Sequence, residues 1–152
     1  VLPSVRQAEL QLLDDRSNNK EYLPIEGDAG FCARALTFAY GADVDLDTIA
    51  GVQTLSGTGA CRIGGQFLST FLPGRQIYIP VPTWGNHWKL FAECGLDCQP
   101  YRYYDRGTNG LDVDGILNDM AAAPDGSIIL LHACAHNPTG CDPSMEQWKQ
   151  IA

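Results

Sequence analysis

Three short stretches of the chain carry residue types that could hold an anion or a flat ligand: residues 56–59 (SGTG), 82–87 (PTWGNH) and 132–140 (HACAHNPTG). In the first, small residues at a helix start would let backbone N–H groups approach an anion, and the hydroxyls of Ser56 and Thr58 would add donors. This stretch therefore predicts a phosphate site. The alternative is a capped helix that simply follows a tight turn.

The glycine-rich stretch fits neither of the two familiar nucleotide motifs. The dinucleotide fingerprint GxGxxG requires a small residue where Arg62 stands, and the P-loop requires a Lys-Ser or Lys-Thr pair that this stretch lacks. The mismatch argues against a doubly wound oxidoreductase and against a P-loop enzyme. A more general phosphate cradle stays open.

The second stretch places Trp84 just past an expected strand, beside polar residues. A tryptophan is usually a core residue, but in this position it could stack on a flat ligand. In the third stretch, His132, Cys134 and His136 alternate, so a metal site is conceivable. No fourth ligand is apparent and the turn at Asn137 leads the chain away, so we expect no metal.

Regular elements must position these stretches. The apolar periodicity predicts strands at 52–55, 76–81, 97–104 and 127–133, a loop at 44–48, and helices at 2–15, 31–40, 61–71, 84–94, 112–123 and from 143. Such alternation predicts an α/β fold, a mostly parallel sheet with helices on both faces. Ligands bind such sheets at the carboxyl ends of the strands, which is where the three stretches fall.

Composition narrows the function classes. The 152 residues carry a net charge of −8, which disfavours binding to nucleic acid or to anionic membranes. The apolar run at 128–131 is far shorter than the roughly 20 residues of a membrane span. No secretory signal is visible, and the six cysteines form no CxxC pair. We expect reduced, mostly buried thiols in an intracellular protein.

Seven segments, in order, resemble the aspartate aminotransferases, which are class-I pyridoxal-phosphate (PLP) enzymes. The segments are EYLPIEG, VQTLSGTGACRIGGQFL, PTWGNH, YRYYD, GLDVDGILNDM, LLHACAHNPTGCDP and EQWKQIA. The resemblance implies the large PLP-binding domain of fold-type I aminotransferases. Because the chain begins with Val1 and stops inside its last expected helix, we expect residues 1–152 to be a single partial domain, truncated at both ends.

The resemblance also implies roles for individual residues. Ser56, Gly57 and Thr58 match the positions that hold the PLP phosphate. Trp84 matches the tryptophan that stacks on the pyridine ring. Asn137 matches the asparagine that donates to the ring's phenolic oxygen, which tunes the cofactor's reactivity. Trp84 and Asn137 also lie next to the substrate in the family.

Further positions match more distant parts of the family's site. His87 matches a histidine that orients the aspartate paired with the pyridinium nitrogen. Tyr22 matches a tyrosine that reaches the phosphate of the neighbouring subunit, which implies a homodimer with shared sites. Pro82 and Pro138 match positions where the family carries cis peptides.

The implied reaction is amino transfer between L-aspartate and 2-oxoglutarate, giving oxaloacetate and L-glutamate. The family's Schiff-base lysine has no match here, since Lys20, Lys89 and Lys149 stand in other contexts. We therefore expect no catalytic residue within this chain and no activity from the chain alone. Two alternatives stay open: an aromatic-amino-acid aminotransferase of the same family, and a non-catalytic fragment that binds phosphate. The compartment, whether cytoplasm, mitochondrion or plastid, is not resolved.

Overall fold

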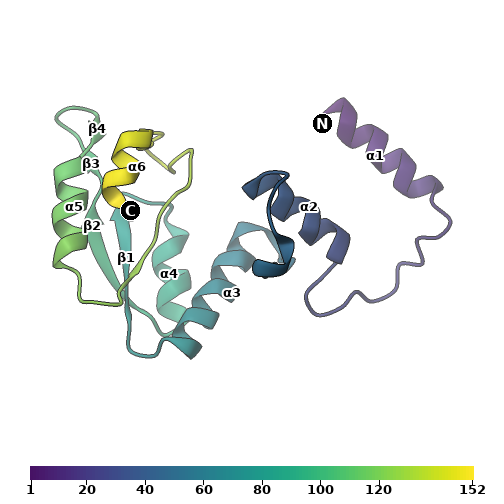
Figure 1. Cartoon of the computed structure of the whole chain (residues 1–152), viewed down its shortest axis with the longest axis horizontal. Helices are drawn as coiled ribbons and strands as arrows, with labels where there is room; N and C mark the ends of the chain where they lie inside the picture. The colour runs from purple at the N-terminus through teal and green to yellow at the C-terminus, as the bar shows by residue number, and fades with distance from the viewer. The chain divides into compact units, whose positions relative to one another are not determined.

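The computed structural model describes all 152 residues, which form two compact units, Val1–Gln53 and Thr54–Ala152. Both are drawn in Figure 1. No helix in either unit combines the length and the apolar character that crossing a membrane requires.

The first unit is helical, as its sequence predicts. It contains α1 (Pro3–Asp14) and α2 (Ala29–Tyr40). The Asp28 side chain caps α2 by accepting from the N–H of Phe31 at 2.6 Å, and Gly41 ends the helix at φ 97°. The loop expected at 44–48 is wrong in part, because Leu46–Thr48 forms a 3-10 turn, η1, capped by Asp45.

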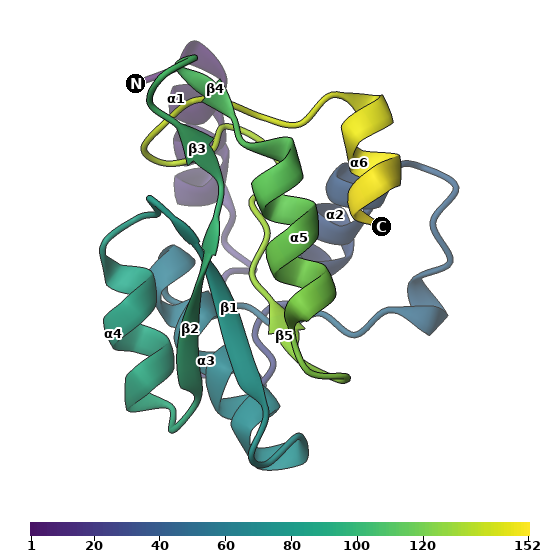
Figure 2. The ribbon, with the colours of Figure 1, turned by 90° about the vertical axis from the view of Figure 1, so that its left-hand side faces the viewer.

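The second unit contains a parallel sheet and the helices that cover it. Its elements are α3 (Ser56–Phe71), β1 (Gln76–Val81), α4 (Asn86–Glu93), β2 (Asp97–Arg102), β3 (Tyr104–Asp105), β4 (Gly110–Leu111), α5 (Val113–Ala122), β5 (Ile128–Ile129) and α6 (Met145–Ile151). The strand order is β2-β1-β5, with both pairings parallel. Figure 2 shows these strands side by side.

Both faces of the sheet are covered, which confirms the predicted α/β architecture. Side chains alternate along β1. Ile77 and Ile79 are buried against α3 and α4 together with Phe91. On the opposite face, Tyr101 and Ile116 form a second cluster, contributed by β2 and α5. Figure 1 shows the strands between α5 on one side and α3 with α4 on the other.

Two expected strands differ from the structure. Residues 52–55 belong to no sheet, because no neighbouring strand is present to satisfy their backbone groups, and Gln53 donates instead to the Glu26 carbonyl at 2.8 Å. The strand expected at 127–133 is regular only over Ile128–Ile129. It pairs with β1 alone, and only the N–H of Leu130 prolongs the pairing, to the Tyr78 carbonyl.

The tyrosine-rich strand expected at 97–104 is in fact two strands. β2 ends at Arg102, and β3 then pairs antiparallel with β4 in a short hairpin. The turn of this hairpin is held by Asp105, which accepts from the N–H of Gly107 and the hydroxyl of Thr108. Sequence reasoning missed this turn.

Three of the four helices in the second unit, α4, α5 and α6, begin within two residues of their predicted starts. The helix predicted at 112–123 is confirmed, with Asp112 as its N-cap accepting from Gly115. α4 begins later than the predicted residue 84, which leaves Trp84 in the preceding loop. α6 begins at Met145, where Ser144 and Gln147 form a capping box. α3 begins at Ser56, five residues before the predicted start.

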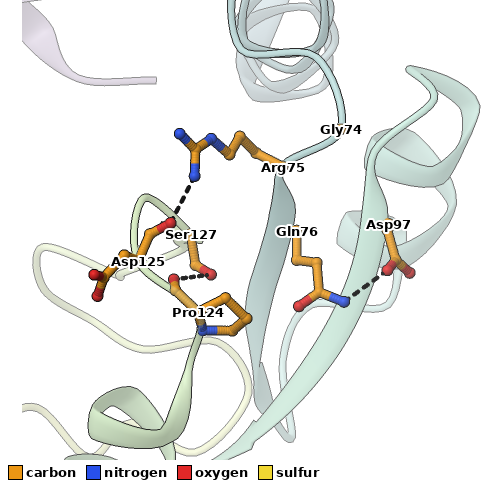
Figure 3. A pocket seen from close by; sticks show the side chains of 7 residues that line it. All are labelled: Gly74, Arg75, Gln76, Asp97, Pro124, Asp125 and Ser127. Carbon is orange, nitrogen blue, oxygen red and sulfur yellow. Dashed lines mark hydrogen bonds between the residues drawn. The ribbon is translucent and has the colours of Figure 1, made fainter.

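The amino ends of the strands carry a pocket lined by polar side chains, drawn in Figure 3. There Arg75 donates to the Asp125 carbonyl at 2.6 Å, and Gln76 donates to the Asp97 carboxylate at 2.8 Å. These bonds fasten the loops at this end of the sheet. The three stretches singled out from the sequence lie at the other end.

The cysteines are more exposed than expected. All six are free thiols, but only Cys94 is buried; Cys134 is exposed and the other four are half-buried. Cys94 lies between α3 and α4, with its Sγ 3.5 Å from the Arg62 carbonyl oxygen.

Candidate functional site

The first turn of α3 carries the glycine-rich stretch. Ser56 adopts a left-handed backbone at φ 59°, and this turn of the chain starts the helix at Ser56 itself. The N–H groups of Gly57 and Thr58 donate to no acceptor in the protein, and no side chain caps the helix. The stretch therefore exposes unpaired donors at the positive end of a 16-residue helix.

Space is also available at this helix start. A Cβ built on Gly57 meets nothing within 4 Å, and the side chains of Ser56 and Thr58 are exposed. Because a short turn joins α3 to β1, the two run in opposite directions. The start of α3 thus lies toward the same side of the unit as the carboxyl end of β1, as Figure 1 shows.

The tryptophan turn leaves the carboxyl end of β1. Trp84 is half-buried, and its ring meets the His87 ring edge-on, with centroids 5.2 Å apart. His87 lies in the first turn of α4 and is buried, stacking on Phe91 at 6.0 Å. The structure thus supports Trp84 with a histidine rather than placing it in the core.

A threonine joins this turn to the asparagine turn. The Thr83 hydroxyl oxygen lies 2.9 Å from His87 Nδ1 and 3.1 Å from His132 Nε2. The other nitrogen of His132, Nδ1, accepts from the backbone N–H of Asn137 at 3.3 Å. A continuous hydrogen-bonded chain therefore links Asn137 to His87.

The direction of this chain follows from its one fixed donor. Burial lowers the pKa of both His87 and His132, so both rings are neutral near pH 7. The Asn137 N–H can only donate, so His132 Nδ1 is bare and its proton is on Nε2, which donates to Thr83. The Thr83 hydroxyl then donates to His87 Nδ1, which leaves His87 with an Nε2–H donor that has no partner in the chain.

A second group of aromatic rings packs against the turn that carries Asn137. The His136 ring lies between His132, at 4.2 Å, and Tyr103, at 3.8 Å. His136 is 2% exposed, and burial lowers its pKa to about 4. Its Nδ1 pairs with the Thr139 hydroxyl at 2.8 Å, while its Nε2 is buried without a partner.

The loop that carries Asn137 is tied to its own far end. The Asp142 carboxylate accepts from the N–H groups of Ala135 and His136, at 2.6 and 2.8 Å. Both X-Pro bonds expected to be cis, those before Pro82 and Pro138, are cis in the structure. Asn137 itself is exposed at the carboxyl end of β5.

The predicted site residues are thus brought together unequally. Trp84, His87 and Asn137 share one contact network. The Ser56–Thr58 turn lies toward the same side of the unit but makes no hydrogen bond to them. Tyr22 belongs to the first unit, and its side chain is fully exposed.

Sequence reasoning missed two residues of the network, Thr83 and Asp142. Thr83 lies in the loop that follows β1, and Asp142 lies in the loop that precedes α6. The signal that could have identified them is that both are polar residues in loops at the carboxyl ends of the strands. Of the residues considered for a metal site, His132, Cys134 and His136, the two histidine rings lie 4.2 Å apart with planes inclined by 31°, and the structure brings no three His, Cys, Asp or Glu side chains together as metal ligands.

Comparison with known proteins gives a consistent match. The family model for aminotransferase class I and II matches residues 1–152. Aspartate aminotransferase 1 of Medicago sativa is 53% identical over 154 residues, which cover 99% of this chain and 37% of the relative. Relatives named as cytoplasmic, mitochondrial and chloroplastic aspartate aminotransferases match as well. The chain thus spans well under half the length of these relatives.

Solved structures agree with the sequence match. The cytoplasmic aspartate aminotransferase of Saccharomyces cerevisiae superposes with a TM-score of 0.95 at 45% identity, covering 99% of this chain and 37% of that one. An aromatic-amino-acid aminotransferase of Burkholderia pseudomallei, covalently bound to pyridoxal phosphate, superposes at 0.91 and 40% identity, covering 99% of this chain and 38% of that one.

Proposed function

Because the chain belongs to the class I and II aminotransferases, we propose that it is part of an aspartate transaminase that uses pyridoxal phosphate. The reaction is amino transfer from L-aspartate to 2-oxoglutarate, giving oxaloacetate and L-glutamate. The observation that carries the proposal is the hydrogen-bonded chain from Asn137 through His132 and Thr83 to His87, beside Trp84. It joins the two turns whose residues would contact the cofactor ring.

The residues present fit the cofactor's phosphate. The unpaired N–H groups of Gly57 and Thr58, the open space at Gly57 and the helix dipole together suit a dianion. The hydroxyls of Ser56 and Thr58 supply further donors. In a chain with net charge −8, such local donors are the means by which a phosphate can be held.

The ring would be held by the two other turns. Trp84 offers an aromatic face that His87 supports edge-on. The Asn137 side chain offers a neutral donor to an anionic ring oxygen and to a substrate carboxylate. The partnerless Nε2–H of His87 suits a carboxylate acceptor, such as the aspartate that the family pairs with the ring nitrogen.

When bound, the cofactor supplies an electron sink for the α-carbon chemistry of amino transfer. The residues of this chain bind and orient; none of them moves the proton. We propose that the lysine that does so, and the arginines that grip the substrate carboxylates, lie in the rest of the parent protein. The exposed Tyr22 is proposed to reach the phosphate of a second subunit in a homodimer.

The test is made on the full-length parent protein, in the numbering used here. Aspartate with 2-oxoglutarate should be the preferred substrate pair; a preference for tyrosine or phenylalanine would assign the aromatic aminotransferase instead. The relatives' compartments differ, so we propose only an intracellular enzyme. The isolated 152 residues, treated with PLP and borohydride, should carry no stoichiometrically labelled lysine.

Substitution of Asn137 tests the ring contact separately. Loss of a donor to the anionic ring oxygen raises the proton affinity of the basic nitrogen beside that oxygen, so Asn137→Ala should raise the pKa at which the bound cofactor's absorbance changes. An unchanged spectrophotometric titration would remove Asn137 from the assigned role.

A further inference from the structure

The loop between β5 and α6 turns back on itself around a single carboxylate. Asp142 Oδ2 accepts from the N–H of Ala135 at 2.6 Å, and its Oδ1 accepts from the N–H of His136 at 2.8 Å. These two residues immediately precede Asn137. Each oxygen of Asp142 thus fixes one peptide group on the approach to the residue that would contact the cofactor.

The backbone at this point needs such support. Ala135 adopts the left-handed region at φ 51°, which a residue with a Cβ rarely populates and which costs on the order of 1 kcal/mol or more. Two N–H groups in succession point to the same side there, and the carboxylate satisfies both. Without an acceptor, both donors would have to turn to water, and the peptide groups could rotate.

The carboxylate is itself held in place. Cys141, the residue before Asp142, accepts at its carbonyl from the hydroxyl of Tyr103 at 2.7 Å, and Tyr103 is 4% exposed. On the other side Pro143 is buried, and α6 follows. Asp142 therefore joins the turn around Asn137 to the core beneath α5.

The negative charge of Asp142 strengthens its hold on the loop. The two backbone hydrogen bonds lower the pKa of Asp142, with His136 contributing first and Ala135 second. Bonds from N–H groups to an ionised carboxylate are stronger than bonds to a neutral acceptor. The Asp142 carboxylate that holds Ala135 and His136 is therefore ionised at neutral pH.

We propose that Asp142 is a positioning residue that sets the place of the Asn137 side chain against bound pyridoxal phosphate. This inference rests on the proposed function, because it assumes that Asn137 contacts the cofactor. The family resemblance of the sequence implies no role for Asp142.

The experiment is a double-mutant cycle in the full-length holoenzyme, read by spectrophotometric pH titration of the bound cofactor. Asp142→Ala should raise the cofactor's pKa in the same direction as Asn137→Ala, but by less, and lower kcat/KM by about tenfold. In the Asn137→Ala background, Asp142→Ala should cause no further change in that pKa, because Asp142 acts only through Asn137.

Asp105→Ala is the matched control. Asp105 also holds a turn, through the N–H of Gly107 and the Thr108 hydroxyl, and its pKa is lowered by the same kind of bonds. That variant should lose stability while the cofactor's pKa stays unchanged. Asp142→Asn, which keeps the size of the side chain but not its charge, serves if the alanine variant does not fold, and should shift the pKa in the same direction.

The outcomes separate the two proposals. If Asn137→Ala shifts nothing, the cofactor role of Asn137 fails and the inference falls with it. If Asn137→Ala shifts the pKa but neither Asp142 variant does, only the inference fails, and Asp142 is a structural residue. Equal Asp142 shifts in both backgrounds would also overturn it, because Asp142 would then act independently of Asn137.

Discussion

Tyr103 and His136 stack face to face, with ring centroids 3.8 Å apart and planes inclined by only 13°. The stack buries an imidazole whose Nε2 has no partner, directly before the residue that would contact the cofactor. Such an arrangement favours the neutral ring, since a charged imidazolium would lose its hydration and gain no acceptor at Nε2.

His136 should therefore make stability depend on pH. Burial lowers the pKa of His136 from 6.5 to about 4. Between these two values the His136 ring binds a proton in the unfolded chain but stays neutral in the folded protein. This contribution to stability is complete above pH 6.5 and is lost as the pH falls to about 4, with a slope of at most about 1.4 kcal/mol per pH unit. His136→Phe, which keeps the stack, should flatten the slope in urea unfolding of the full-length apoprotein.

Thr139→Val is the control for this slope. It removes the hydroxyl 2.8 Å from His136 Nδ1 but keeps the titrating ring, so it should lower stability and leave the slope in place. A slope that is the same in His136→Phe and in the unsubstituted protein would contradict the prediction.

The Thr83 bridge makes a prediction about protonation. In the full-length protein, nitrogen-15 NMR should find both His87 and His132 as Nε2–H tautomers, because Thr83 donates to the first and accepts from the second. Thr83→Val removes both bonds at nearly constant volume and should leave His87 a mixture of tautomers, with kcat/KM lower by about tenfold. Thr83→Ser should keep the tautomers. Finding His87 protonated at Nδ1 before any substitution would reverse the direction assigned here.

The sequence predicted the strands of the sheet with unequal success. Gln76–Val81 was exact, because its alternation is bounded by glycine, arginine and proline and both of its neighbours are present. The strand predicted at 52–55 is absent, and the strand predicted at 127–133 is regular only over Ile128–Ile129, because a strand needs partners and these segments have none and one, respectively, in the structure. The early start of α3 depends on the left-handed Ser56, which no helix propensity predicts.

The residues of the site divide in the same manner. Trp84 and Asn137 could be proposed from the sequence because their residue types and turns are distinctive. Thr83 and Asp142 were missed because a threonine after a strand and an aspartate before a helix are common, and only the folded chain brings their oxygens to His132 and His136.

The start of α3 predicts a loss of cofactor affinity. A hydroxyl that donates to a dianion contributes about 1.5–3 kcal/mol, so Thr58→Val should weaken PLP binding to the full-length apoprotein by about ten- to a hundredfold. Thr70→Val is the control: its hydroxyl donates to the Gln66 carbonyl at 2.8 Å, near the opposite end of the same helix. Fluorescence titration with PLP gives both constants, and equal affinities in the two variants would remove Thr58 from the phosphate site.

Two adjacent glycines of α3 predict stability changes of opposite sign. A Cβ on Gly65 would lie 2.8 Å from Cys94 Sγ and 3.0 Å from Phe91 Cδ1, whereas a Cβ on Gly64 meets nothing within 4 Å. Gly65→Ala should destabilise the full-length apoprotein by about 1–3 kcal/mol, because Cys94 and Phe91 are buried and the helices would have to separate. Gly64→Ala should stabilise it by about 0.5–1 kcal/mol through helix propensity alone.

A second substitution identifies the side chain that a methyl group at residue 65 would meet. Cys94→Ala removes the sulfur nearest to the new methyl group, so in urea unfolding it should cost less in the Gly65→Ala background than in the unsubstituted protein. If the two changes in the free energy of unfolding were strictly additive, the new methyl group would not be in contact with Cys94, and α3 and α4 would have adjusted at other residues. The close approach of these helices at Gly65 would then not be what seats α3, and with it the Ser56–Thr58 turn, against the sheet.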